Sequence, residues 1–138
     1  HEWSSQPLAA NQSGWDWFAL HLNDGRALMI YRMREEPPEG LKSYWLSGSL
    51  ITQDGSKTNI LGDEVILEVL GIEDVGGRTL PLRWRVLIPK YDIDLKIEPL
   101  HTNQFISGAL PYWEGVVFAT DSGTRKEAGR GYMELMGY

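Results

Sequence analysis

Two runs of aromatic and aliphatic residues, 15–22 and 26–34, lie on either side of the short segment 23–25, which reads Asn-Asp-Gly. Residues of these types suit a pleated, half-buried strand, and an Asp-Gly pair between two such runs is the strongest short-range signal for a β-hairpin. Because a hairpin pairs residues that are close in sequence, this stretch constrains the fold more than any other. It predicts two long antiparallel strands near the start of the chain.

The length of the turn decides which side chains of the hairpin share a face. A two-residue turn at 24–25 gives paired residue numbers that sum to about 49, so that Asp16 lies opposite Met33 and diagonal to Tyr31. A three-residue turn with a bulge moves the register by one and brings Trp17 beside Tyr31 instead. We favour the two-residue turn because it separates polar from apolar side chains better, although the sequence is compatible with both.

The rest of the chain repeats this pattern of short strand-like runs separated by turn signals. No stretch shows a sustained helical period. The further predicted strands cover 44–52, 57–61, 65–72, 83–88, 92–98, 104–108, 112–120 and 131–138. About nine or ten short strands, spaced roughly 8–12 residues apart, predict an all-β fold. The successive hairpins favour a lipocalin-like antiparallel up-and-down β-barrel, which closes its own edges and can hold a ligand inside.

Length and charge restrict the classes of function. The 138 residues form one predicted domain, and a net charge of −6 argues against a nucleic-acid partner. No apolar run reaches the ~20 residues of a membrane span, so the chain is not predicted to be transmembrane. The chain has no cysteine, which rules out disulfides and Cys nucleophiles. It begins at His1-Glu2-Trp3 without an initiator Met, and we expect it to be part of a longer protein.

Motifs of familiar enzyme classes are missing from the sequence. It contains no nucleophile elbow, zinc-protease helix or phosphate-binding loop, and we predict no cofactor. The three histidines, at positions 1, 21 and 101, lie far apart in the sequence, so no metal site is predicted.

Carboxylates within apolar strands are the residues that most suggest chemistry. Asp16 lies between two Trp, and Glu114 and Glu134 lie in runs that are otherwise aromatic or aliphatic. A carboxyl group buried in such a place has a raised pKa and can act as a general acid near neutral pH. The alternative is that each carboxylate faces solvent or pairs with an Arg such as Arg32.

Aromatic side chains give the second set of candidates. Those singled out for ligand binding are Trp15, Trp17, Tyr112 and Trp113, together with the neighbouring Glu114. They predict an aromatic-lined pocket for an apolar or conjugated small molecule. The alternative is that they pack within the barrel, since aromatic residues suit half-buried strands.

Four stretches occur in order along the chain: His1-Glu2-Trp3-Ser4, then Gly14-Trp15-Asp16-Trp17-Phe18 with Asp24-Gly25-Arg26, then Tyr112-Trp113-Glu114-Gly115, and finally Gly129-Arg130-Gly131-Tyr132-Met133-Glu134-Leu135 with Gly137-Tyr138. Together they resemble the C-terminal lipocalin-like half of the AttH-like proteins. These are predicted secreted hydrolases related to the carotenoid hydratases (hydroxyneurosporene synthases). The resemblance covers the whole chain.

The resemblance implies an architecture and a cellular setting. It implies two tandem barrel-like domains, of which this chain is the second, with the preceding domain as a partner. It also implies a periplasmic or secreted protein, associated with an ABC transporter in some cases. The implied ligand is a hydrophobic lipid- or terpenoid-like small molecule.

In the hydratase branch, the resemblance implies addition of water across a double bond. The matching catalytic positions are His1, Trp3 and Tyr31, but Met33 stands where that branch has an Asp. In the two-residue-turn register Asp16 supplies a carboxylate at the same spot, and we include it as a candidate catalytic residue. The alternatives to an enzyme are a non-catalytic ligand carrier and a structural partner of the preceding domain.

Overall fold

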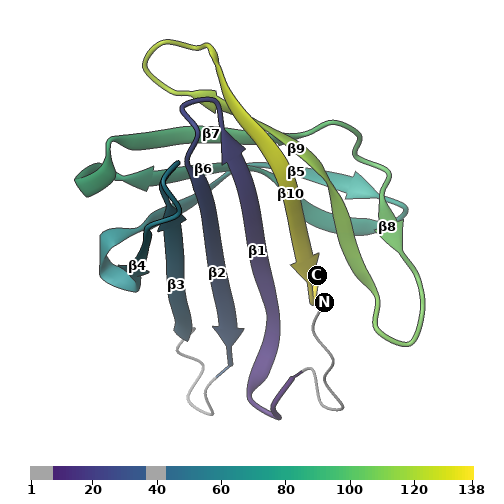
Figure 1. Cartoon of the computed structure of the whole chain (residues 1–138). Coiled ribbons are helices and arrows are strands. Elements are labelled where there is room, and N and C mark those ends of the chain that lie inside the picture. Colours follow the sequence, from purple (N-terminus) through teal and green to yellow (C-terminus); the bar gives the residue numbers. More distant parts are fainter. Residues whose placement is uncertain (1–7, 37–42) are drawn as a thin grey trace.

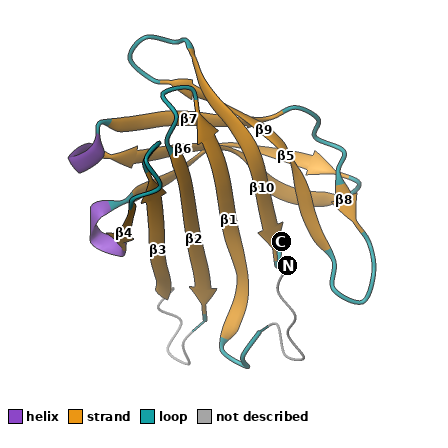
Figure 2. Ribbon diagram, in the orientation of Figure 1, coloured by secondary structure: helices purple, strands orange, loops and turns teal. Residues whose placement is uncertain are grey.

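One antiparallel sheet, strongly curled into a half-barrel, makes up the computed structural model, which describes residues 8–36 and 43–138 (Figures 1 and 2). The strands are β1 (Gln12–Leu22), β2 (Ala27–Glu35), β3 (Ser43–Ile51), β4 (Lys57–Leu61), β5 (Ile66–Val75), β6 (Arg78–Ile88), β7 (Ile93–Pro99), β8 (Phe105–Ile106), β9 (Tyr112–Asp121) and β10 (Glu127–Met136). Two short 3-10 helices, η1 (Gly62–Glu64) and η2 (Pro89–Tyr91), complete the regular structure of these ranges. The predicted all-β antiparallel class is confirmed.

The strand order is β4-β3-β2-β1-β10-β9-β7-β6-β5, with the short β8 paired to β9. Neighbours in the sheet are mostly neighbours in the chain, as expected for an up-and-down arrangement. The pairing of β1 with β10 joins the beginning and end of the described chain, and both strands cross the middle of Figure 1. The sheet ends at β4 and β5, which are not paired with each other, so the barrel that we expected to close is open at this seam.

Alternation of side chains along each strand separates a buried inner face from a more exposed outer face. In β7, for example, Ile93, Leu95 and Ile97 are buried while Lys96 and Glu98 are exposed. Phe18 from the front of the half-barrel meets Trp84 from the back, edge to face, with ring centroids 5.6 Å apart. Large apolar side chains thus occupy the inner face, where we had expected room for a ligand. The largest fully buried ones are Trp84, Trp113, Phe18, Leu20, Leu28, Ile30, Ile60, Leu80, Leu82, Ile88, Ile97 and Met133.

The first hairpin exists as predicted, but the register that we favoured is wrong. Trp17 pairs with Tyr31, and Asp16 pairs with Arg32 instead of Met33. The turn has three residues: Leu22 N donates to Arg26 O at 2.8 Å, and Gly25 N donates to Leu22 O at 3.0 Å.

Two features explain this register. Gly25 adopts φ +86°, the left-handed conformation that a three-residue turn with a bulge requires and that glycine adopts without strain. The register that we favoured also placed Arg32 on the face of the hairpin opposite to that of Asp16. In the observed register Arg32 lies on the same face directly opposite Asp16, so the two charges compensate each other.

Several strand boundaries differ from the prediction. β10 begins four residues before the predicted 131, and β6 begins five residues before the predicted 83, at Arg78. β6 accommodates Pro81 because the β5–β6 register is irregular there and pairing with β7 starts only at Trp84. The predicted strand 104–108 is reduced to β8. None of the helices in the described ranges is long and apolar enough to cross a membrane.

Candidate functional site

A groove of about 430 Å³ crosses the outer face of β1, β10 and β9. Its lining combines apolar, aromatic and charged side chains, namely Trp17, Ala19, His21, Glu114, Val116, Arg130, Gly131 and Tyr132. Alternation explains every side chain of the set, since odd-numbered residues of β1 and even-numbered residues of β10 and β9 point outward, and Gly131 contributes its backbone. At position 131 a Cβ would collide with the carbonyl oxygen of Ala19, so only glycine allows the two strands to approach this closely.

The pairing register orders the groove from one end to the other. His21 is the cross-strand partner of Arg130, which gives the groove a cationic end. In the middle Ala19 pairs with Tyr132, which is 51% exposed and lines the groove. At the far end Glu134 is the partner of both Trp17 and Glu114. The groove is therefore apolar in its centre and charged at both ends.

Aromatic residues continue this face beyond the groove toward β2 and β3. Trp17 pairs with Tyr31, and the Tyr31 ring meets Trp45 edge to face at 6.0 Å between centroids. The Trp15 indole N–H donates to Glu134 Oε1 at 2.5 Å, which fixes both side chains beside the groove. Three of the predicted site residues, Trp15, Trp17 and Tyr31, thus share one face of the sheet.

Two carboxylates lie side by side at the far end of the groove. Glu114 and Glu134 are direct cross-strand partners, an arrangement in which like charges repel. The Trp15 hydrogen bond offsets part of this repulsion for Glu134. Burial, followed by the charges of Glu114 and Glu134, raises the pKa of the neighbouring Tyr112 hydroxyl.

Asp16 lies on the opposite, inner face of β1 and has no exposed surface. Arg32 Nε donates to its Oδ2 at 2.7 Å, and the Tyr138 hydroxyl donates to its Oδ1 at 2.6 Å. Arg34 Nε approaches Oδ2 at 3.4 Å. Burial, together with the Asp16 carboxylate, raises the pKa of the Tyr138 hydroxyl well above its usual range.

Asp16, Arg32, Arg34 and Tyr138 form an inner cluster, which aromatic rings and backbone carbonyls complete. The Arg32 guanidinium lies over the Trp84 ring at 4.9 Å, and that of Arg34 lies over the Tyr138 ring at 4.0 Å. Arg34 also donates to the carbonyl oxygens of Met136 and Gly137. The cluster therefore holds residues 136–138 against β1 and β2. These contacts explain why a carboxylate is buried at position 16.

The structure brings together part of the predicted site and divides the rest. Asp16 and Tyr31 lie on opposite faces of the sheet, so the shared acid that we expected from the two-residue turn does not form. Met33 faces Trp15 on the outer side. Trp113 is fully buried on the inner face, with its indole N–H donating to Thr102 O at 2.7 Å, and is not part of the groove.

Two predicted catalytic residues, His1 and Trp3, lie outside the described residues. Sequence reasoning missed Arg130 and Tyr132 as groove residues, because the last predicted strand started too late and its alternation was not followed. Within residues 8–36 and 43–138, no group of three or more His, Asp or Glu could hold a metal ion.

Comparison with known proteins identifies the chain's relatives. The AttH-like family model matches residues 1–138. A crystal structure assigned to AttH (NE1406) from Nitrosomonas europaea superposes with a TM-score of 0.80 at 34% sequence identity, covering 99% of this chain and 42% of that one. This chain thus corresponds to less than half the length of that relative. Curated proteins give no significant match. With the family model matched over every residue, the chain belongs to the AttH-like family.

Proposed function

We propose that this AttH-like chain binds an elongated, mainly apolar small molecule of the lipid or terpenoid class in the outer groove of β1, β10 and β9. The observation that carries the proposal is the groove itself. The groove is about 430 Å³ in volume and is apolar in its centre, between Trp17 and Tyr132, whereas the inner face is filled by the protein's own side chains. Small-molecule sites are typically concave and apolar with a few polar groups that fix orientation.

The outer face has a composition that supports such a role. A sheet face that only contacts water normally carries polar residues, whereas this one carries a row of aromatic side chains across three neighbouring strands. Flat aromatic rings bury a large area of an isoprenoid or acyl chain at little cost in side-chain entropy. A ligand of about 20 heavy atoms at about −0.3 kcal/mol per atom gives about −6 kcal/mol, or a Kd on the order of tens of micromolar.

The experiment is a titration of the chain with dibromostearic acid, whose bromine atoms quench tryptophans that they contact. We expect saturable quenching of intrinsic fluorescence, and displacement by farnesol, a terpenoid alcohol. Trp17→Ala should weaken the affinity about tenfold, because it removes one wall of the groove. Trp45→Ala is the matched control, since Trp45 is 54% exposed on the same face but does not line the groove. Equal effects of the two substitutions, or no saturation, would contradict the proposal.

A catalytic version of this function, hydration of an alkene, requires a proton donor on the ligand's side of the sheet. Glu114 and Glu134 lie on that side, whereas Asp16 lies on the other. Incubation of an isoprenoid alkene in H₂¹⁸O tests this version. Hydration adds one labelled water to the product, and Glu134→Gln should abolish the addition.

The alternative is that the outer face seats the remainder of a longer protein, with this chain as a structural partner. The relative from Nitrosomonas europaea is more than twice as long as this chain, which supports that alternative for the whole protein. On the basis of the family resemblance, we propose for each of these functions that the protein is periplasmic or secreted and works beside an ABC transporter. Cell fractionation followed by detection of the protein in the periplasm or medium tests the location.

A further inference from the structure

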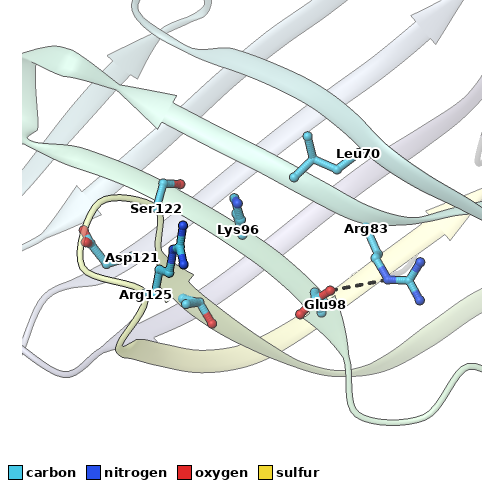
Figure 3. A pocket seen from close by; sticks show the side chains of 8 residues that line it. Leu70, Arg83, Lys96, Glu98, Asp121, Ser122 and Arg125 are labelled. Carbon is cyan, nitrogen blue, oxygen red and sulfur yellow. Dashed lines mark ion pairs between the residues drawn. The ribbon is translucent and has the colours of Figure 1, made fainter.

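A second groove, of about 360 Å³, lies on the outer face of the half-barrel where β5, β6, β7 and β9 run side by side (Figure 3). It is separate from the groove of β1, β10 and β9, here called the aromatic groove. Its lining residues are Leu70, Arg83, Lys96, Glu98, Thr120, Asp121, Ser122 and Arg125. Three of these residues are cations in a chain whose net charge is −6. In Figure 3, Lys96 lies between Arg125 on one side and Arg83 on the other.

Local structure places each cation. In β7 the inward direction of Leu95 and Ile97 turns Lys96 outward, opposite Thr120 of β9. Arg125 lies in the turn between β9 and β10 with φ +61°, and its backbone N–H donates to Asp121 O at 2.8 Å. That turn brings Arg125 back over the end of β9, beside the groove.

The carboxylates around the groove already have partners. Asp94 accepts two hydrogen bonds from Arg85, at 2.8 and 2.9 Å, and one from Ser122 Oγ at 2.7 Å. These contacts lower the pKa of the Asp94 carboxyl group to about 2. Asp121 Oδ1 accepts from the backbone N–H and hydroxyl of Thr124, at 2.6 and 2.7 Å.

Of the three cations that line the groove, Arg83 already has ion-pair partners, whereas Lys96 and Arg125 have none among the described residues. Arg83 forms ion pairs with Glu73 and, at 3.4 Å, with Glu98. Within the part of the chain that the structure describes, the side chains of Lys96 and Arg125 form no hydrogen bond or ion pair. Lys96 and Arg125 thus both line the hollow without an ion-pair partner of their own in the described ranges. The negative charges nearest to them are those of Asp94, which acts on Lys96 but is bound to Arg85, and Asp121, whose hydrogen-bond donors are neutral.

We propose that this groove binds a phosphate monoester, with Lys96 and Arg125 holding the phosphate and Leu70 contacting the organic part. Arginine and lysine are the two side chains that recognise phosphate, the first as a planar fork of donors and the second as a point charge. Thr120 places a hydroxyl next to Lys96. Leu70 is 48% exposed on the neighbouring wall, an apolar surface that inorganic phosphate would leave uncovered. The phosphate monoester can come from a soluble metabolite or from a lipid headgroup.

The test is calorimetric titration of the full chain with phenyl phosphate and, separately, with inorganic phosphate. Lys96→Gln and Arg125→Asn should each weaken the binding of both probes about threefold to tenfold, and added salt should weaken it further. Asparagine suits the left-handed backbone at position 125, so this variant keeps the turn. Leu70→Ala should weaken the binding of phenyl phosphate only. Lys57→Gln, an exposed cation on β4, is the matched control and should change neither titration.

Vesicles distinguish the two sources of the phosphate. Binding to vesicles that contain phosphatidic acid, but not to pure phosphatidylcholine, with loss in Lys96→Gln, assigns the site to a lipid headgroup. Binding of phenyl phosphate without vesicle binding assigns it to a soluble ligand. The proposal is overturned if neither probe saturates at millimolar concentrations, or if Lys57→Gln weakens binding as much as Lys96→Gln and Arg125→Asn do. Trp17→Ala should leave this binding intact, which separates it from the aromatic groove.

Discussion

Substitution of Asp16 by Asn tests how the inner face holds the end of the chain. Asn keeps the shape of the side chain but removes the negative charge between Arg32 and Arg34, whose side chains are only 15% and 21% exposed. It also replaces the charged acceptor of the Tyr138 hydroxyl with a neutral one. The substitution therefore leaves two largely buried guanidinium groups without a counter-charge.

The expected loss in the free energy of unfolding follows from the burial of Asp16. Removing one partner of a buried ion pair costs about 3–5 kcal/mol, whereas an exposed pair is worth about 0–1 kcal/mol. Because Asp16 has no exposed surface, the buried figure applies. That loss is a large share of the roughly 5–15 kcal/mol by which a domain of this kind is stable. At roughly 3–4 °C per kcal/mol for this chain length, Tm should fall by about 10–20 °C.

The assay is urea unfolding followed by tryptophan fluorescence, with a thermal melt in parallel. Asp63→Asn is the matched control, because Asp63 is exposed in η1, and it should change the free energy of unfolding by no more than about 0.5 kcal/mol. A double-mutant cycle with Tyr138→Phe should give a coupling energy of about 0.5–3 kcal/mol. If Asp16→Asn destabilises the chain by less than about 1 kcal/mol, or no more than Asp63→Asn does, the inner cluster does not hold the fold together.

Three further predictions concern pH and packing. The pKa of Tyr138 is raised in the folded state, so its contribution to stability is complete below about pH 10 and is lost as pH rises further; Tyr138→Phe should flatten the alkaline limb of a stability–pH curve. The pKa of Asp94 is lowered to about 2, so its contribution is present above the unfolded value near 4 and is lost as pH falls from about 4 to about 2; an unchanged acid limb in Asp94→Asn would contradict this. Gly131→Ala should destabilise by about 1–3 kcal/mol or more in chemical unfolding, because its Cβ meets the Ala19 carbonyl oxygen, whereas a Cβ at Gly108 meets nothing within 4 Å and Gly108→Ala should be neutral.

Local sequence patterns were sufficient for most of the sheet. The Asp-Gly pair gave the first hairpin, and the alternation of residues 92–98 gave the two faces of β7, because both signals depend on neighbours a few residues apart. These local signals do not determine the register of the hairpin. Turns of two and three residues both place glycine at position 25, and separation of polar from apolar side chains favoured the turn that the structure does not have.

Distant contacts explain the rest. Tyr138 is 122 residues from Asp16 in sequence, and Arg34 reaches the carbonyl of Met136 across 102 residues. No local pattern predicts such pairs. The same holds for the groove, because pairing of β1 with β10 is what places Tyr132 beside Ala19. Alternation could have separated Trp113, on the inner face, from its neighbour Glu114, on the outer face, had a reference side been known.

The central claim is that a ligand binds to the outer face of the half-barrel and not inside it. The ¹H–¹⁵N spectrum of the tryptophan indole groups tests this most directly, because Trp17 lines the outer groove while Trp84 and Trp113 are fully buried on the inner face. On titration with farnesol, the indole signal of Trp17 should shift saturably, and those of Trp84 and Trp113 should stay in place. Saturable shifts of Trp84 and Trp113 with an unchanged Trp17 signal would place the ligand inside the half-barrel and contradict the account.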